Sequence, residues 1–155
     1  MFNKLIVALM PLAPRFIVKM ISKRYIAGED TASAMATCHT LTQEGFLTTV
    51  DILGESVTEA AQAIAARDSY LDLISEVISN KVEKNISLKP TALGLGLSEE
   101  LAFANIAAIV KKAHESDLFI RIDMEDSPYT DRTLKFYEKL RKDYPRLGTV
   151  IQAYM

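Results

Sequence analysis

The chain has 155 residues, of which 49% are hydrophobic and 25% are charged, so it is long enough for one globular core and unlike a disordered protein. Its formal net charge is -2 with both signs interspersed, which argues against a nucleic-acid surface. The one cysteine, Cys38, excludes an internal disulfide and fits a reducing compartment, and its Ala-rich helical surroundings predict a small, buried apolar side chain.

The N-terminus has the charge and apolar length of a short signal peptide over residues 1–13. Pro11 and Pro14 interrupt this run, basic residues follow it, and there is no clear small-residue cleavage site. A basic, amphipathic leading helix is therefore favoured over a signal peptide, which leaves weak contact with a membrane surface open. No stretch approaches the roughly 20 apolar residues that a spanning helix needs.

Two helices are predicted before a repeating part begins. Apolar residues recur at helical spacing over 15–25 until Gly28 stops the pattern. A second helix is predicted from about Thr31, with Gly45 as its stop. We take residues 1–44 as an N-terminal helical arm.

From residue 45 onward, strand and helix alternate in units of roughly 30–40 residues, as parallel βαβ construction predicts. Strands are predicted at 46–53, 86–89, 119–123 and 148–154. The buried helix faces are predicted to be Val57, Ala60, Ala61, Ile64, Leu71, Ile74 and Ile78; then Phe103, Ile106, Val110 and Ala113; then Leu134, Tyr137, Leu140 and Tyr144. The expected fold class is α/β with a parallel sheet.

Two helix starts are locally encoded. Ser98 with Glu99 and Glu100 places an N-cap and two carboxylates at the positive end of a helix. Ser127 followed by Pro128 offers a cap with proline at the first helical position. These polar residues are therefore explained without a function.

The four predicted strands each end in a polar side chain: Asp51, Lys89, Asp123 and Gln152. The carboxyl ends of parallel strands meet at one rim, which is where barrel enzymes and open α/β sheets place their ligands. Lys89 could equally form a structural ion pair with Asp51 or Asp123. Four converging residues favour a site, and an ammonium flanked by carboxylates suits a zwitterion, with Lys89 facing its carboxylate.

Other candidate sites are weaker. Gly94-Leu95-Gly96 lacks the third glycine of a dinucleotide fingerprint and is interpreted as a flexible strand-to-helix turn. His39 and His114 have no ligand-spaced partners, so no metal site is expected. Ser56 has no histidine base at a strand end, which disfavours a hydrolytic triad.

Five motifs in order resemble the N-terminal half of monofunctional bacterial proline dehydrogenase, from about Pro11 to Met155. They are RYIAGE at 24–29, DILGE at 51–55, SLKPTALGL at 87–95, DMEDS at 123–127 and QAY at 152–154. The resemblance implies FAD-dependent oxidation of L-proline to Δ1-pyrroline-5-carboxylate. It also implies a distorted (β/α)8 TIM-like barrel, with 45–155 as its first half and strands one to four. The implied location is cytoplasmic, with peripheral contact at the inner membrane, where a quinone takes the electrons.

The resemblance also implies roles for individual residues. Lys89 would contact the substrate carboxylate, and Asp123 would hold Lys89 and shape the proline pocket. These two are the catalytic candidates and, with Glu55, the substrate-binding candidates. Gln152 would lie against the flavin ring near its reactive nitrogen. Glu55 would pair with an arginine of the last helix and gate the pocket. Pro90 departs from the apolar residue usual in the family, a change that a strand end tolerates.

Length is the larger departure, because a full barrel takes about 250 residues and eight strands. The family's paired substrate-binding arginines and most of its FAD contacts belong to the second half. We therefore expect a truncated form without independent catalysis. The alternative function is a non-catalytic half-barrel module that binds a partner or a second copy through open strand edges. A third interpretation is a different barrel enzyme that acts on an amino acid and uses no flavin.

Overall fold

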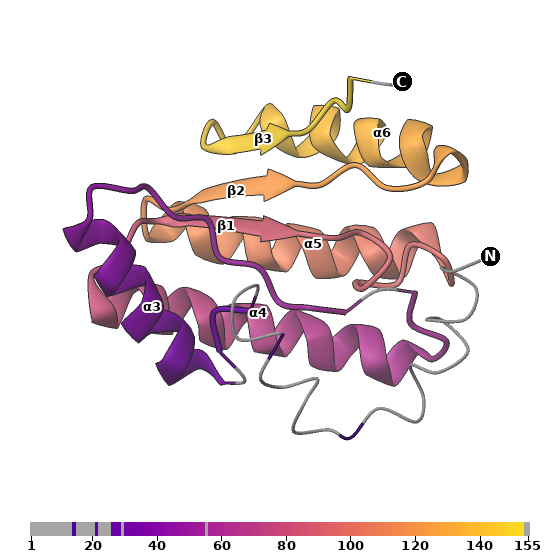
Figure 1. The fold of residues 1–155 in the computed structure, drawn as a ribbon. Coiled ribbons are helices and arrows are strands. Elements are labelled where there is room, and N and C mark those ends of the chain that lie inside the picture. The colour runs from indigo at the N-terminus through magenta and orange to yellow at the C-terminus, as the bar shows by residue number, and fades with distance from the viewer. Residues whose placement is uncertain (1–13, 15–20, 22–25, 29, 55, 154–155) are drawn as a thin grey trace.

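A computed structural model describes residues 14, 21, 26–28, 30–54 and 56–153 (Figure 1). Its elements are α3 (Thr31–Gln43), α4 (Ala60–Asn80), β1 (Asn85–Leu88), α5 (Glu99–Glu115), β2 (Phe119–Ile122), the 3-10 turn η2 (Ser127–Tyr129), α6 (Thr130–Arg141) and β3 (Leu147–Thr149). The expected α/β class is confirmed. Most of the leading helix expected at 15–25 lies outside the described residues, and the division at residue 44 stays a prediction.

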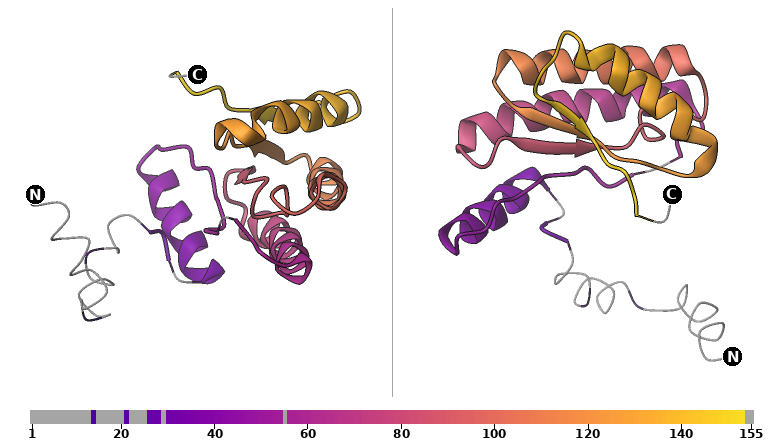
Figure 2. Two further views of the ribbon diagram at one scale, coloured as in Figure 1. Left: turned by 90° about the vertical axis from the view of Figure 1, so that its right-hand side faces the viewer. Right: turned by 90° about the horizontal axis from the view of Figure 1, so that it is seen from above.

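The sheet has the order β1-β2-β3, and both strand pairs are parallel, as the alternation predicts. Ile120 in the central strand lies between Ile86 and Leu147. The chain then places α4, α5 and α6 on one side of this sheet, whereas α3 lies near the amino ends of the strands (Figures 1 and 2). A parallel sheet covered by crossover helices leaves its strand carboxyl ends together at one rim.

The first predicted strand is wrong in extent, because only Val50 joins the ladder. Its amide donates to Asn85 O at 3.0 Å, and its carbonyl accepts from Ser87 N at 2.9 Å. Phe46 and Leu47, at the start of the predicted strand, are 58% and 86% exposed, so no burial holds them against β1. The last strand is also shorter than 148–154, although Val150 N still donates to Ile122 O at 3.2 Å.

Apolar side chains alternate along the strands and form the core on the helix-covered side. Ile86, Leu88, Ile120 and Ile122 are all at most 1% exposed. Because side chains on a strand point alternately to opposite faces, Lys89 and Asp123, one residue beyond Leu88 and Ile122, lead toward the other face. Cys38 is buried in the same hydrophobic cluster, as predicted.

The buried face of α4 differs from the predicted one. Ile64 and Ile78 are 39% and 37% exposed. The buried residues of this helix are Ala63, Tyr70, Leu73, Ile74 and Val77. The sequence of α4 offers several apolar stripes at helical spacing, and packing against the sheet and α5 decides which of them is buried. The observed orientation of α4 about its axis places the side chain of Tyr70 in the interior.

The two predicted caps have different outcomes. Ser98 caps α5 as expected, since its hydroxyl accepts from Leu101 N at 3.2 Å. The Ser127 cap is wrong, because Ser127 and Pro128 form η2, in which Tyr129 N donates to Asp126 O at 2.8 Å. The chain therefore turns once in a 3-10 conformation before α6 begins.

The segment around Gly94 is a turn between β1 and α5, as predicted, and its leucines are part of the core. Leu93 and Leu95 are at most 1% exposed. Gly94 has a φ of +102°, and a Cβ there would lie 3.2 Å from Ala63 Cβ. Glycine is needed here for conformation and for close approach to α4.

Candidate functional site

A cavity of about 550 Å³ opens at the carboxyl ends of the strands. This volume lies within the range of small-molecule sites. The cavity is lined by Ser56, Lys89, Thr91, Arg121, Asp123, Met124, Glu125, Asp126, Tyr129, Val150 and Gln152. The structure thus brings three of the four predicted strand-end residues to one cavity, and the fourth, Asp51, is bonded to Lys89.

Lys89 is held by an ion pair with Asp51. Lys89 Nζ lies 2.6 Å from Asp51 Oδ2, and the two side chains are 20% and 26% exposed. Lys89 follows β1, whereas Asp51 follows the bridging residue Val50 of the neighbouring segment. The sequence offered Asp51 and Asp123 as possible partners of Lys89, and the structure shows an ion pair with Asp51.

Tyr70 completes this group from the helix layer. Its hydroxyl donates to Asp51 Oδ1 at 3.0 Å, so the two carboxylate oxygens of Asp51 have different partners. Tyr70 is 1% exposed. Burial first, and then the negative charge of Asp51, raise the pKa of Tyr70 well above its ordinary range, with a further contribution from Asp123. The phenol therefore keeps its proton to a higher pH than an ordinary tyrosine.

We expect this group to make the protein less stable at alkaline pH. Below about pH 10, Tyr70 keeps its proton in both the folded and the unfolded state and contributes no pH dependence. Above that pH the unfolded state loses the proton while the folded state keeps it, so the free energy of unfolding falls by up to about 1.4 kcal/mol per pH unit. Denaturant titrations near pH 9, 10 and 11 measure this slope.

Tyr70→Phe should show a shallower alkaline decline than the parent chain, whereas Tyr137→Phe, on α6, should keep the parent slope. Equal slopes for the parent and Tyr70→Phe would contradict the assigned environment of the phenol.

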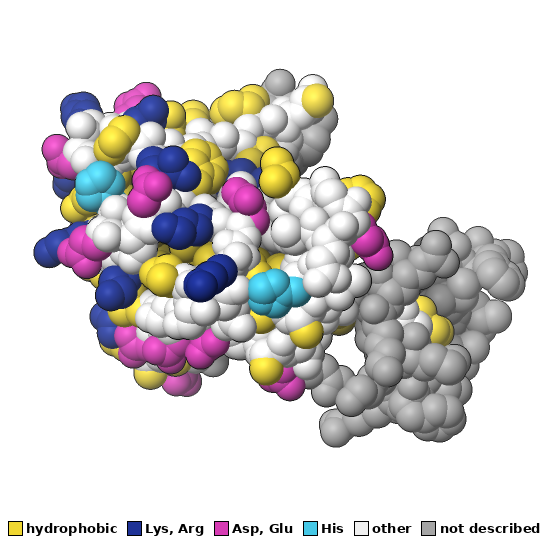
Figure 3. Space-filling model, turned by 90° about the vertical axis from the view of Figure 1, so that its left-hand side faces the viewer, with side chains coloured by type: hydrophobic (Ala, Val, Ile, Leu, Met, Phe, Trp, Pro, Cys, Tyr) yellow, Lys and Arg dark blue, Asp and Glu magenta, His cyan; other side chains and the backbone are white. Residues whose placement is uncertain are grey.

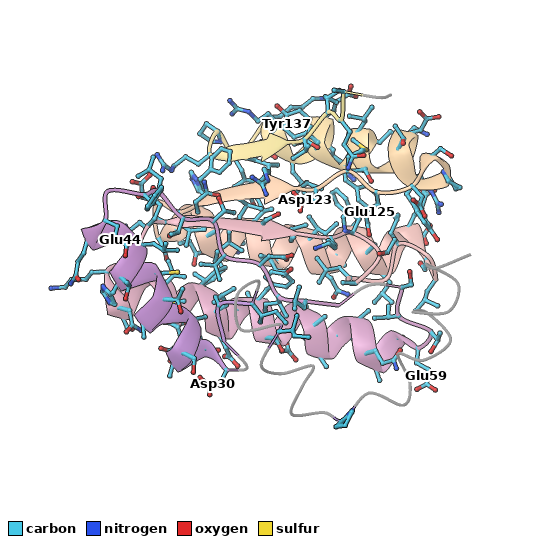
Figure 4. The ribbon with its side chains drawn as sticks, viewed as in Figure 1. Asp30, Glu44, Glu59, Asp123, Glu125 and Tyr137 are labelled. Atoms are coloured by element: carbon cyan, nitrogen blue, oxygen red, sulfur yellow. The ribbon has the colours of Figure 1, made fainter. Side chains whose placement is uncertain are left out.

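Asp123 forms an ion pair with Arg121. Arg121 Nε donates to Asp123 Oδ1 at 3.0 Å, and both residues line the cavity. Arg121 belongs to β2, and Asp123 follows the last residue of that strand, two positions later, so both side chains leave the same face of the sheet. Figure 4 shows Asp123 and Glu125 beyond the end of β2. The proposed support of Lys89 by Asp123 stays a prediction.

Glu125 joins the loop after β2 to the loop after β1. Its carboxylate accepts from Thr91 N at 2.7 Å and from the Thr91 hydroxyl. Thr91 is 3% exposed, and its hydroxyl also accepts from Ser56 N at 3.4 Å. These bonds fix the rim on both sides of Lys89 and satisfy a buried backbone donor.

Gln152 lines the cavity beyond β3, and its Nε2 donates to Met124 O at 3.3 Å. A carboxamide offers both a donor and an acceptor, which suits a ring edge carrying carbonyl and N–H groups. The position is compatible with the flavin contact expected for this residue. Glu55 lies outside the described residues, so its gating role stays a prediction.

Sequence reasoning missed the roles of Tyr70, Arg121, Thr91 and Glu125 in building this site. Arg121 had a signal, because it precedes Asp123 by two residues on a predicted strand. Tyr70 had a weaker one, because a buried tyrosine usually needs a partner for its hydroxyl. The bonds of Thr91 and Glu125 join residues 34 positions apart and had no local signal.

Other site classes find little support in the described part of the chain. Figure 3 shows the end of the molecule on the side of the strand amino ends, where basic and acidic side chains are interspersed. Among the residues that the structure describes, no group of three or more His, Cys, Asp and Glu side chains could hold a metal ion. Within those same residues, no helix is long and apolar enough to cross a membrane.

The sequence model of the proline dehydrogenase family matches residues 34–155. The chain belongs to the proline dehydrogenase family. Proline dehydrogenase 1 of Bacillus subtilis subsp. natto is 34% identical over 143 residues, which cover 92% of this chain and 47% of that relative. The proline dehydrogenase of Deinococcus radiodurans is 30% identical over 87% of this chain and 45% of that relative. The chain thus spans about half the length of these proline dehydrogenases.

A solved structure has the same fold. It is the crystal structure of proline utilization A (PutA) from Bdellovibrio bacteriovorus inactivated by N-propargylglycine. It superimposes with a TM-score of 0.82 and 23% sequence identity, covering 95% of this chain and 18% of that one. The likeness shows that the parallel sheet and its helices belong to a fold found in a proline utilization protein.

Proposed function

We propose that these residues form the carboxylate-binding side of a proline dehydrogenase site that oxidises L-proline to Δ1-pyrroline-5-carboxylate with FAD. The observation that carries the proposal is an ammonium, Lys89, held by Asp51 at a cavity that also contains Asp123 and Gln152. This arrangement occurs in a chain whose family is named for proline oxidation. It suits a zwitterion, because cationic and carboxylate side chains line the same cavity.

The residues divide the recognition of proline between its two charged groups. Lys89 would bind the proline carboxylate, because an ammonium donates several hydrogen bonds to carboxylate oxygens. Asp123 would face the proline nitrogen and, with Arg121, shape the cavity wall. Forming the product requires loss of a hydride from the methylene carbon bonded to nitrogen and of a proton from nitrogen. The positioned substrate would present this carbon toward the side of the cavity lined by Gln152.

The cofactor of the proposed reaction is FAD. Its bound flavin would supply the two-electron acceptor that the amino-acid substrate needs. Gln152 is the described residue that would hold the ring, through its carboxamide at the cavity wall. We further propose that the electrons pass to a membrane quinone through peripheral contact of a cytoplasmic enzyme.

The scaffold of the proposed site is the first half of a (β/α)8 barrel. The three parallel strands and the segment that bridges to β1 at Val50 would be four consecutive strands of such a barrel. Helices α4, α5 and α6 lie outside them on one side, in the positions that barrel helices take (Figure 2). The cavity at the strand carboxyl ends agrees with the face on which such barrels carry their sites.

The test is anaerobic reduction of flavin by L-proline on the purified 155-residue chain after incubation with FAD. The length of the chain predicts no independent catalysis, whereas the proposed site predicts that flavin bound to the chain bleaches with L-proline but not with prolinamide, which lacks the carboxylate that Lys89 would bind. Bound flavin that does not bleach with L-proline would contradict the activity proposed for this chain. Equal bleaching by prolinamide would contradict the assigned role of Lys89.

A second candidate function, association through the open strand edges, is favoured by exposed apolar side chains at both edges. Leu47 and Leu53 are 86% and 72% exposed beside β1, and Ile151 is 67% exposed beyond β3. A non-catalytic module would use these edges to pair with a partner or a second copy. Sedimentation velocity over a range of concentrations tests self-association. A monomer at all concentrations, with no flavin bound, would contradict pairing with a second copy.

A further inference from the structure

We propose that Tyr70 and Asp51 are positioning residues that aim the Lys89 ammonium into the cavity. The proposal rests on the proposed function of Lys89 and adds to it a connection from the helix layer to the substrate side. Tyr70 and Asp51 do not line the cavity, so they would act through Lys89.

Lys89 needs such support because of its own chemistry. A lysine side chain has four flexible methylene groups, and holding its ammonium in one place costs rotamer entropy. The 2.6 Å contact with Asp51 Oδ2 supplies one fixed bond. Through that bond, the ammonium is held in one position only if the Asp51 carboxylate is itself held in place.

The backbone before Asp51 is held by the two hydrogen bonds of Val50 to Asn85 and Ser87. In this segment only Val50 joins the ladder with β1, and Leu53, two residues after Asp51, is 72% exposed. The second support of the Asp51 carboxylate is the Tyr70 hydroxyl, 3.0 Å from Oδ1. With one oxygen bonded to the phenol and the other to the ammonium, rotation of the carboxylate would break one bond or the other.

Tyr70 is a firm anchor because it lies in the middle of α4. It belongs to the buried face of that 21-residue helix, with Ile74 and Val77 one and two turns later. Its exposed fraction of 1% leaves the ring little room to move. The phenol is protonated at neutral pH, as an ordinary tyrosine is, so its hydroxyl donates to Asp51, and its raised pKa extends this range to higher pH.

The competing explanation is that the hydroxyl of Tyr70 is only a satisfied polar group in the core. In that case its removal would change stability and leave the behaviour of Lys89 unaltered. A positioning role predicts that the ammonium itself becomes more mobile and more accessible to reagents.

The experiment measures acylation of Lys89 in the full chain with a small amine-reactive ester, followed by peptide mass spectrometry. Lys84, whose Nζ donates to Ser116 O at 3.0 Å, is the internal reference in every sample. Acylation consumes the neutral, accessible amine, so an ammonium held by a carboxylate reacts slowly. We expect the Lys89 rate, relative to Lys84, to rise about two- to fivefold in Tyr70→Phe and about tenfold in Asp51→Asn.

Tyr137→Phe is the matched control, since it removes a phenol hydroxyl on α6 away from this group. It should leave the Lys89 rate unchanged. An unchanged Lys89 rate in folded Tyr70→Phe would overturn the role of Tyr70, whatever its stability. If that variant does not fold, an unchanged rate in Asp51→Asn overturns the proposal.

The result is separable from the proposed function, because acylation needs neither flavin nor proline. In the flavin-loaded chain, Tyr70→Phe should raise the proline concentration for half-maximal bleaching about three- to tenfold, with little change in the rate at saturation. Altered acylation in a chain that never oxidises proline would support the positioning and contradict the function. Normal acylation of the variants in an active chain would contradict the positioning alone.

Discussion

Lys89→Ala is expected to weaken the binding of L-proline by about 100-fold or more, the largest functional effect of any single change in the cavity. The variant removes the one lysine ammonium among the residues that line the cavity. Loss of a charge-assisted bond to a partly buried carboxylate costs roughly 2–5 kcal/mol, and each 1.4 kcal/mol is tenfold. Titration calorimetry with L-proline measures the loss directly, on chain that has first been loaded with FAD.

Lys84→Ala is the control for this prediction, because it removes an exposed lysine near the amino end of β1 without touching the cavity. Its affinity for proline should match the parent chain. Lys89→Arg should also bind weakly, since a guanidinium fork cannot take the position of a compact ammonium beside Asp51. Unchanged affinity in Lys89→Ala would remove the basis for the carboxylate-binding role.

Ile120→Ala is expected to lower the free energy of unfolding by about 3–4 kcal/mol, the largest effect on stability. Ile120 is 1% exposed in the central strand, between Ile86 and Leu147. Removing three carbons there loses transfer free energy and leaves a space that neighbours on both sides cannot fill. Denaturant unfolding followed by circular dichroism should show a lower midpoint with an unchanged slope.

Ile64→Ala makes the same chemical change at a position that was predicted to be buried but is 39% exposed on α4. It should cost about 1 kcal/mol or less, because little apolar area is lost and no cavity forms. Equal losses for the two variants would contradict the observed orientation of α4 and the place of Ile120 in the core.

The family motifs and the strand-end residues were readable from sequence because they depend on short-range patterns. Alternating apolar residues predict a strand, and the residue that follows predicts what reaches the rim. Lys89, Asp123 and Gln152 meet at the cavity for this reason. The cap at Ser98 was predictable on the same grounds, since its bond reaches only three residues along the chain.

The partners of these side chains were not readable from sequence. Asp51 and Asp123 are both one strand away from Lys89, and strand periodicity gives no reason to choose between them. In the structure Lys89 forms an ion pair with Asp51, and Arg121 forms one with Asp123. The bond from Tyr70 to Asp51 depends on how α4 is rotated against the sheet.

The sequence by itself determined the α/β class, the alternation of strands and helices, the parallel pairing of the strands and the family. It also determined which strand ends carry polar side chains. Tertiary structure alone decided the short first strand, the buried face of α4, the bonds of Glu125 to Thr91 and the support of Lys89 by Asp51 and Tyr70. The physical reason is the distance along the chain over which each interaction acts. Local periodicity and caps act over a few residues, whereas helix rotation, edge pairing and ion-pair choice depend on contacts between residues far apart in the chain.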